Sequence, residues 1–441
     1  NNYTNPDFTI HFAKEFQENG VSYIYAVGHI KTDPVIIKIR KNGTTVWQKS
    51  LLTGKQNLSF YKILQLHSAK GYQYIITAYD GRQLYILSVE QSGDCNWYKN
   101  IVTQDEDIHC FLEPIVGRNG FYVAYSDKND EDKLKNPIVV KFNDRGIILE
   151  QVVLRSLVAN NGFVINTAKS HKWGLVLAGR IIKTDSVGII IDLREDFKTY
   201  EAKLIAKPSI TIQDIDVNGD TDYTISAYCK EADAIIVSHI GTEFTAPYYV
   251  FPNTQNHASV LAKSEKLLYM SIYSRENGTV HALSSKFSVL WSKKLIHNGH
   301  DLGVKTLEFD TDSNCLTSTT WNESLLVHTT DAFESCLTKA ITSTRLINDK
   351  LIIEHIRLQI QKTRIAITNS KFSSKELKSE FEVVCGDNDP CIKDKRLCAL
   401  HEQLQATYEK CFAKLTPRNF SEGDKKKKIM LDLILQFNES H

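Results

Sequence analysis

The chain has 441 residues, of which 42% are hydrophobic and 10% aromatic, so it is expected to be a globular protein with a large buried core. Its 53 basic and 52 acidic residues leave a net charge of +1, which excludes recognition of nucleic acid or of an anionic membrane through a strong overall positive field. No apolar run approaches the roughly 18 residues that a membrane-spanning helix needs.

A unit of about 48 residues recurs along roughly the first three quarters of the chain. Its clearest copies end in a turn followed by a strand that contains a tryptophan, as in Gly43 before Trp47 and Gly93 before Trp97. The equivalent turn positions are Gly43, Gly93, Gly146, Phe197, Phe244, Phe287 and Phe333. A repeat of this length is typical of one blade of a β-propeller.

Each unit is predicted to contain four strands separated by turns. The second and third strands are nearly continuous apolar runs, as in residues 23–27 and 34–39, which indicates burial on both faces. The fourth strands are more polar and alternate, as in residues 47–51, which suits an outer edge where lysine blocks pairing between sheets. The sequence therefore predicts a mainly β fold, with a seven-bladed β-propeller over residues 1–345.

One position of the repeat, four residues after each reference turn, is rich in large side chains. It carries Trp47, Trp97, Glu150, Glu201, Tyr248, Trp291 and Leu337. Because tryptophan recurs here in several units, we expect it to cover the groove between neighbouring blades. A stacking platform for a ligand is the alternative.

Residues 34–49, which contain the Asn42-Gly43 turn and the Trp47-Gln48-Lys49 strand, resemble the repeat of bacterial β-propellers of the quinoprotein-like and delta-60 type. The resemblance implies the fold rather than an activity. Other propeller signatures are absent from the sequence: it contains no Trp-Asp dipeptide of WD40 blades and no Gly-Gly pair of kelch blades. Since it also lacks the adjacent cysteines of quinoprotein alcohol dehydrogenases, no bound quinone is expected.

No catalytic motif is present: the sequence lacks a G-x-S-x-G elbow, an H-E-x-x-H helix, a Walker A loop and a G-x-G-x-x-G loop. Carboxylates from different blades can still meet at the central channel, as in propeller glycosidases. Three or more acidic, histidine or arginine side chains at the channel mouth would favour an enzyme or a lectin. A lining of aliphatic and small residues would favour a scaffold.

Two acidic loops are candidates for a cation site. The first has oxygen-bearing side chains at alternate positions around Gly219, which suits calcium: Asp216, Asn218, Asp220 and Asp222. Thr224 and Ala227 stand where such loops supply further ligands, so a plain hairpin is the alternative. The second loop, residues 127–132, is expected to be solvated.

The last hundred or so residues change character. Residues 346–372 contain alternating apolar positions and are predicted to form a β connector, whose one or two strands either dock on the propeller or start a small connector of their own. Residues 373–441 are predicted to form a helical appendage, whose first helix has an apolar face of Leu377, Phe381 and Val384. The last helix either packs within the appendage or docks on another subunit through Ile429, Leu431, Leu433, Ile434, Leu435 and Phe437.

Four of the nine cysteines lie in this appendage. Across the turn before the Pro390 helix, Cys385 can reach Cys391 or Cys398, which predicts a disulfide; unpaired thiols are the alternative. A zinc site is disfavoured because no C-x-x-C pair is present. The remaining cysteines are expected in the core of the propeller.

The sequence as a whole predicts a non-catalytic module that binds other protein subunits or a glycan, with no cofactor other than calcium. The alternatives are an extracellular carbohydrate-active enzyme or lectin that uses channel carboxylates, and a calcium-dependent adhesin. The chain begins at Asn1 without a methionine, which predicts either a processed, secreted or cell-surface protein or a segment of a longer polypeptide.

Overall fold

The computed structural model describes residues 2–4, 8–30, 33–41, 43–52, 58–68, 71–105, 108–128, 134–156, 162–182, 187–219, 221–252, 258–264, 267–274, 277–297, 300–309, 315–319, 325–329, 338–341, 346–355, 358–362, 367–369, 373–376 and 382–385. Every regular element within these ranges is a β-strand. No helix in the described part of the chain is long and apolar enough to cross a membrane.

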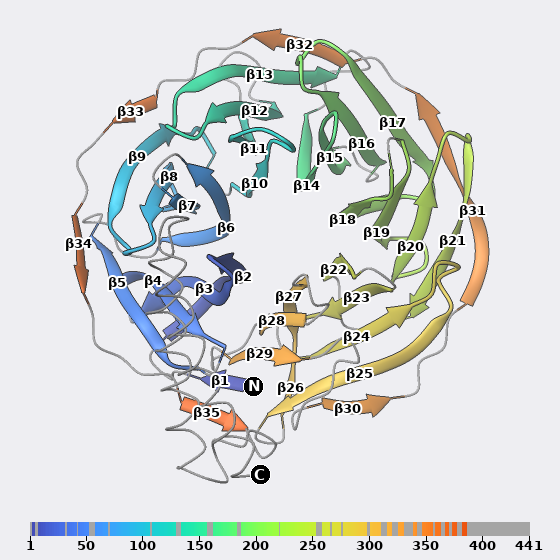
Figure 1. The fold of residues 1–441 in the computed structure, drawn as a ribbon. Coiled ribbons are helices and arrows are strands. Elements are labelled where there is room, and N and C mark those ends of the chain that lie inside the picture. The colour runs from blue at the N-terminus through green and yellow to red at the C-terminus, as the bar shows by residue number, and fades with distance from the viewer. Residues whose placement is uncertain are drawn as a thin grey trace, which may run out of the picture.

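The strands form a β-propeller, in which antiparallel meanders are arranged around a central axis (Figure 1). The innermost strands surround this axis: β2 (Phe8–Glu18), β6 (Ser59–Ser68), β10 (Cys110–Pro114), β14 (Phe163–His171), β18 (Ile210–Val217), β22 (Ala258–Lys263) and β27 (Val304–Phe309). The innermost strands are followed by β3 (Val21–Ile30), β7 (Gly71–Tyr79), β11 (Gly120–Lys128), β15 (Gly174–Ile181), β19 (Tyr223–Cys229), β23 (Leu268–Tyr273) and β28 (Cys315–Thr319).

The third strands are β4 (Asp33–Arg40), β8 (Gln83–Glu90), β12 (Lys135–Asn143), β16 (Val187–Arg194), β20 (Ala234–Ile240), β24 (Gly278–Leu283) and β29 (Leu325–Thr329). The fourth strands are β5 (Thr45–Leu52), β9 (Cys95–Val102), β13 (Ile148–Ser156), β17 (Tyr200–Lys207), β21 (Thr245–Pro252), β25 (Val289–His297) and, from the N-terminus, β1 (Asn2–Thr4). A short strand, β26 (His300–Leu302), pairs with the end of β25. Because β1 pairs with β29, the two ends of the ring are joined by hydrogen bonds.

The continuous burial that the apolar runs predict is confirmed. Six consecutive residues of β4 are buried, as are six of β8 and seven of β7. Hydrophobic clusters fill the spaces between neighbouring meanders, where Tyr25 of β3 and Tyr74 of β7 stack with ring centroids 4.0 Å apart. A strand with a neighbouring sheet on each side must be apolar on both faces, which explains why these runs do not alternate.

The predicted reference turns are confirmed at most positions. A positive φ occurs at Gly43, Gly93, Gly146, Phe197 and Phe287. Each backbone N–H at these positions donates to the carbonyl three residues earlier, as from Gly43 to Arg40 over 2.9 Å. The hairpins that contain Gly43, Gly93, Gly146 and Phe287 also have a register shift beside the turn, as expected when a turn places one residue in the left-handed region. Phe197 and Phe287 are buried, and this burial offsets the cost of the conformation.

Two tryptophans of the repeat, Trp47 and Trp97, cover the next blade, as predicted. The Trp47 indole donates from Nε1 to the carbonyl of Gln91 over 2.8 Å. A Cβ atom on Gly93 would lie 3.0 Å from the Trp47 ring, and one on Gly146 would lie 2.8 Å from the Trp97 ring. Glycine is therefore required at these turns for two reasons: the backbone has a left-handed φ, and the tryptophan ring leaves no room for a Cβ atom.

We expect Gly146→Ala to lower the free energy of unfolding by about 2–3 kcal/mol, because it adds a clash with Trp97 to the strain of a positive φ. Gly117 provides the matched control: its φ is 76°, similar to the 70° of Gly146, and its added Cβ meets nothing within 4 Å. Gly117→Ala should therefore cost about 1 kcal/mol. Equal losses for the two variants in urea unfolding would contradict the role of the ring.

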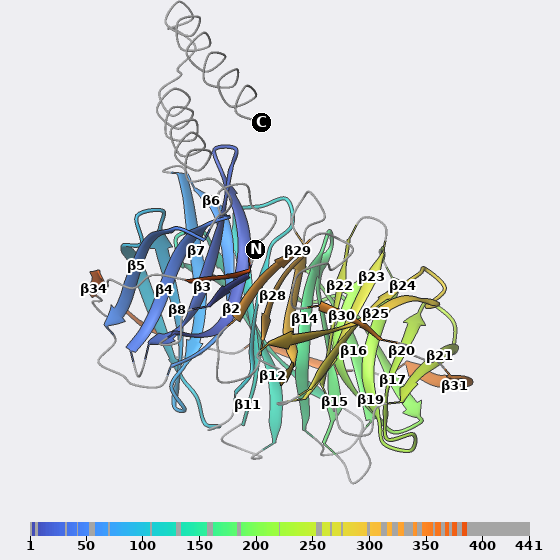
Figure 2. The same cartoon turned by 90° about the horizontal axis from the view of Figure 1, so that it is seen from below.

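The C-terminal part of the described chain forms a belt around the ring (Figure 1). β30 (Thr338–Ile341) pairs with β25, and β31 (Leu346–His355) pairs with both β17 and β21. The belt then continues in the reverse order of the blades: β32 (Leu358–Lys362) joins β13, β33 (Ile367–Asn369) joins β9, β34 (Ser373–Glu376) joins β5, and β35 (Glu382–Cys385) joins β1. Figure 2 shows β34 and β31 at opposite edges of the ring, seen from the side.

The belt determines how the sheets are counted. Among the described residues, hydrogen bonds group the strands into six sheets. The nine-stranded sheet contains two meanders, β14–β17 and β18–β21, which β31 joins through their outer strands. Leu351 and Ile353 of β31 are buried in the core shared by these two meanders, whereas Ile352 between them is exposed.

One prediction for the C-terminal segment is wrong. The apolar spacing predicts a helix that begins at residues 373 and 374, but Ser373–Glu376 and Glu382–Cys385 are strands. The edges of β5 and β1 supply hydrogen bonds to these short segments, and such tertiary pairing overrides a weak helical period. The rest of the predicted helical appendage lies outside the described residues.

Candidate functional site on the inner strands

Five of the innermost strands contain a β-bulge, which places one extra residue beside the axis. The register shifts place these extra residues at His11, Tyr61, Asn166, Gln213 and Lys305. A bulge re-aims the side chain of its extra residue and leaves part of its backbone outside the ladder. All five side chains carry a polar group, and each follows an apolar residue of its strand.

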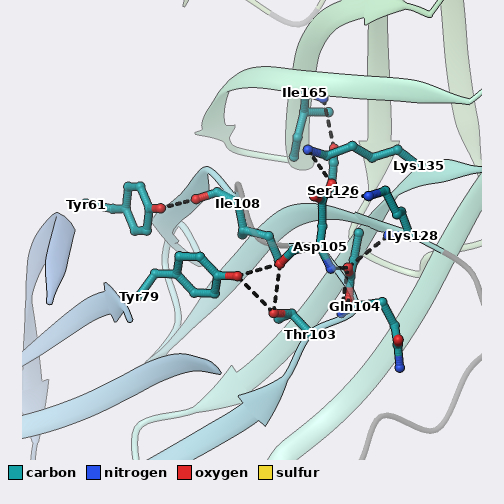
Figure 3. Close-up of polar contacts among 11 residues, drawn as sticks. Tyr61, Tyr79, Thr103, Gln104, Asp105, Ile108, Ser126, Lys128, Lys135 and Ile165 are labelled. Carbon is teal, nitrogen blue, oxygen red and sulfur yellow. Dashed lines mark hydrogen bonds and ion pairs between the residues drawn. The ribbon is translucent and has the colours of Figure 1, made fainter. Parts of the chain in front are cut away.

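Four of these bulge side chains bond to the following blade. The backbone N–H of Phe60 donates to His11 Nδ1 over 3.2 Å, and the Tyr61 hydroxyl donates to the carbonyl of Ile108 (Figure 3). Asn166 Nδ2 donates to the carbonyl of Ile212 over 2.7 Å. Gln213 Oε1 accepts from the Ser259 hydroxyl over 2.6 Å. The bulges thus connect successive innermost strands.

Charged side chains of the inner strands form ion pairs between blades. Lys14 of β2 contacts Glu308 of β27 over 2.8 Å, and Lys62 of β6 contacts Glu113 of β10. Glu113 also accepts from the backbone N–H of Ser170 over 3.2 Å. The carboxylates that the enzyme hypothesis requires are therefore present, but each of these two is paired with a lysine.

The pairing determines how these groups titrate. Burial acts to raise the pKa of Glu308, but the lysines around it, Lys14 first, lower that pKa to about 2. In Glu113, burial is likewise outweighed by the charges of Lys62 and Lys169, and its pKa lies below the ordinary value. A general acid or base needs a pKa near the working pH, so neither carboxylate is suited to that role.

Asp214 and Asp216 of β18 have different surroundings. Asp214 is buried, and it accepts from the Thr167 hydroxyl over 2.7 Å and from the backbone N–H of Leu261 over 2.8 Å. Burial raises the pKa of Asp216, whose Oδ2 atom is buried without a hydrogen bond. The ammonium of Lys169 lies near both carboxylates. Burial of Lys169 acts to lower its pKa, but the surrounding carboxylates, Asp214 first, outweigh that effect and raise it.

The predicted calcium loop is a hairpin between β18 and β19, closed by a hydrogen bond of 2.9 Å from the Asn218 N–H to the Asp222 carbonyl. The Asn218 side-chain oxygen accepts from the Lys263 ammonium over 2.9 Å. Asp220 lies outside the described residues. Elsewhere in the described chain no group of three or more His, Cys, Asp or Glu side chains could hold a metal ion. Calcium binding by Asp216, Asn218, Asp220 and Asp222 stays a prediction.

The second acidic loop is not solvated at its first residue. Asp127 is buried, and its Oδ1 atom accepts from the backbone N–H groups of Gln104, Asp105 and Lys128 over 2.8–3.0 Å. Figure 3 shows this cluster, in which Lys135 contacts Asp105 over 2.7 Å. Backbone donors make a carboxylate a structural cap, so Asp127 fixes the chain that enters β10. Residues 129–133 of the loop lie outside the described residues.

A buried carboxylate also joins the first two blades. Glu18 accepts from the hydroxyls of Tyr25 and Tyr74 and from the Lys38 ammonium, which lies 2.7 Å from Oε2. Because a buried charge is tolerated only when it is paired and hydrogen-bonded, this cluster is structural.

The cysteines fall into two groups. Cys110 and Cys229 are free and buried, as expected, and Cys95 is free and partly buried. Burial raises the pKa of the Cys110 thiol to about 12 and that of Cys95 to about 11, so neither is an activated nucleophile. The backbone of Cys385 lies in β35. Cys391 and Cys398 lie outside the described residues, as do the docking positions Ile429, Leu431, Leu433, Ile434, Leu435 and Phe437, so both predictions remain untested.

The sequence did not reveal the histidine pair beside Lys305. His11 Nε2 and His29 Nδ1 are 2.9 Å apart, and burial followed by the charge of Lys305 lowers the pKa of His11 to about 3. A polar residue directly after an apolar one in an inner strand, as in Ile10-His11 and Val304-Lys305, was the available signal. It marks a bulge only once the register of the partner strand is known.

Comparison with solved structures finds similar arrangements. This chain is similar to a prolyl endopeptidase studied for inter-domain dynamics, with a TM-score of 0.48 and 9% identity, over 77% of this chain and 51% of that chain. It is also similar to the Dos1 propeller, with a TM-score of 0.41 and 11% identity, over 73% of this chain and 78% of that chain. This chain thus spans about half the length of the prolyl endopeptidase. No protein-family model and no curated protein matches the sequence.

Proposed function

We propose that this protein is a non-catalytic module for protein–protein interaction, a structural subunit or recognition domain of a larger assembly. A β-propeller suits this role because every blade contributes loops to two faces of one rigid ring. The observation that carries the proposal is the use of the inner-strand carboxylates: Glu308 and Glu113 are held in ion pairs with lysines, with lowered pKa values.

The competing hypothesis, an enzyme or lectin that acts on polysaccharide, has one observation in its favour. Acidic side chains of several blades do meet near the axis, which is the arrangement expected of a propeller glycosidase. The two carboxylates with a raised pKa do not supply the missing acid: Asp127 accepts from three backbone N–H groups, and the Oδ2 atom of Asp216 is buried.

The proposal includes seven blades of the bacterial repeat type. It counts β14–β17 and β18–β21 as two blades that β31 has joined, beside the five other meanders around the axis. The equivalent turns at Gly43, Gly93, Gly146, Phe197 and Phe287 support a common repeat. A secreted or cell-surface location and calcium-dependent adhesion are proposals of the same kind, which rest on the sequence alone.

The proposal is tested by comparing the full chain with the double variant Glu113→Gln and Glu308→Gln. We expect neither protein to hydrolyse a panel of chromogenic glycosides and peptide anilides. We also expect cross-linking of the wild-type chain in its native source to join it reproducibly to another protein. Turnover by the wild type that the double variant lacks would refute the non-catalytic role. An isolated monomer that binds glycans would refute the role in an assembly.

A further inference from the structure

Lys305 differs from the other bulge residues of the inner strands. His11, Tyr61, Asn166 and Gln213 each bond to the following blade, whereas Lys305 is exposed and forms no ion pair within the described chain. The acid nearest to it along β27, Glu308, is already paired with Lys14. Among the described residues, therefore, no acidic side chain is paired with the Lys305 ammonium, on a strand beside the axis.

The surroundings of Lys305 favour a negatively charged ligand. The inner strands partly desolvate its ammonium, and this lowers its pKa. An anion beside the ammonium would offset that cost, because attraction between charges is stronger where water is partly excluded. The neighbouring His11 stays neutral, because its pKa is lowered to about 3. The positive charge that attracts the anion is therefore that of Lys305 and not that of His11.

The histidine pair lies near the Lys305 ammonium, because the charge of Lys305 contributes to the lowered pKa of His11. His11 Nδ1 accepts from the Phe60 N–H, so the proton of the neutral His11 ring is on Nε2 and is donated to His29 Nδ1. The ring of His11 is therefore held in one tautomer by its two hydrogen bonds.

The backbone of β27 adds further donors. β27 pairs with β28 and is the terminal strand of its sheet, so its other edge faces the axis. The unpaired N–H groups of such an edge are available to a ligand. The bulge at Lys305 removes one further residue from the ladder.

We propose that Lys305, with the free edge of β27, forms a binding site for a small oxyanion, a carboxylate or a phosphate, beside the axis of the ring. The site is independent of the proposed protein partner, because its ligand is a small ion and its residues are not among those assigned to docking.

The test titrates the full chain with inorganic phosphate and, separately, with acetate at pH 7 and constant ionic strength, by calorimetry. We expect at least one of the two to bind, and Lys305→Met to weaken that binding at least about tenfold, the loss that follows from removing one charged hydrogen bond. Lys305→Arg keeps the charge and should retain binding. Lys198→Met, at an exposed lysine of the β16–β17 turn, is the control and should bind as the wild type does.

A second readout locates the ligand. The histidine ring resonances of His11 and His29 should shift during the titration of the wild type and stay unchanged in Lys305→Met. Near-ultraviolet circular dichroism shows whether each variant is folded, and if Lys305→Met is not, Lys305→Gln takes its place. Absence of binding by both anions, or equal binding by the wild type and the folded charge-removing variant, would overturn the site.

Discussion

Leu351→Ala in the belt is expected to lower the free energy of unfolding by about 2–5 kcal/mol, the usual range for truncating a fully buried leucine. Leu351 is 0% exposed and packs in the core shared by β17 and β21. Because β31 pairs with the outer strands of both meanders, this loss of stability measures how strongly β31 connects the two meanders.

The neighbouring residue of the same strand supplies the control. Ile352 is 43% exposed and points away from that core, so Ile352→Ala should change the free energy of unfolding by no more than about 0.5 kcal/mol. Both variants are measured by urea unfolding, followed by tryptophan fluorescence. If the two variants lost equal stability, or if neither lost any, β31 would not be packed on the ring as described.

The belt also explains how the outer edges of the blades are protected. An exposed edge strand offers unpaired backbone groups to other chains and promotes aggregation. Here β32, β33 and β34 each add a strand to the edge of a different blade, and β35 adds one to β1. The closure through the three residues of β1 is thereby held from both sides, by β29 and by β35.

The repeat of the propeller was predictable because its signals are local. A left-handed turn requires glycine or a residue whose burial offsets the strain, and this requirement falls at the same place in successive units, as at Gly93 and Phe197. A long apolar run indicates that a strand is buried, and this inference does not require knowing which strands lie beside it. Both features could therefore be read from residues close together in the chain.

The candidate site was not predictable for the converse reason. Lys14 and Glu308 are separated by 294 positions in the sequence, and no local pattern relates them. The bulges depend on the register between two strands, so the polar character of Lys305 is uninformative until that register is known. The belt strands are short, and the pairing that makes Ser373–Glu376 a strand is supplied by β5, more than 300 residues earlier.

The stability of the protein is expected to fall steeply as the pH drops from 7 to 5, because two histidines stay neutral in the folded state. Burial lowers the pKa of His281 to about 4, and burial together with Lys305 lowers that of His11 to about 3. An unfolded histidine binds a proton below about pH 6.5. Between pH 6.5 and 4 the unfolded state therefore binds more protons than the folded state, and acid favours unfolding.

The expected size follows from the same linkage. Each pH unit below 6.5 costs about 1.4 kcal/mol per histidine, so at pH 5 the two histidines together cost about 4 kcal/mol. Glu308, with a pKa of about 2, stabilises the fold until its unfolded form becomes protonated, near pH 4. Its ionisation therefore does not change the free energy of unfolding between pH 7 and pH 5. His281→Gln should remove about 2 kcal/mol of the difference between pH 7 and pH 5, measured by urea unfolding at each pH.

The comparison between variants isolates the histidines from other titrating groups. Burial raises the pKa of Asp127 and of Asp216, and these carboxyls act in the opposite sense, because the folded state then binds protons more readily than the unfolded state. Their contribution is common to the wild type and to His281→Gln, so it cancels in the difference. His239→Gln, at an exposed position of β20, should keep the wild-type pH dependence. An unchanged dependence in His281→Gln would show that this ring is protonated in the fold, and that its bonds to Thr279 and Ser292 hold an imidazolium rather than a neutral imidazole.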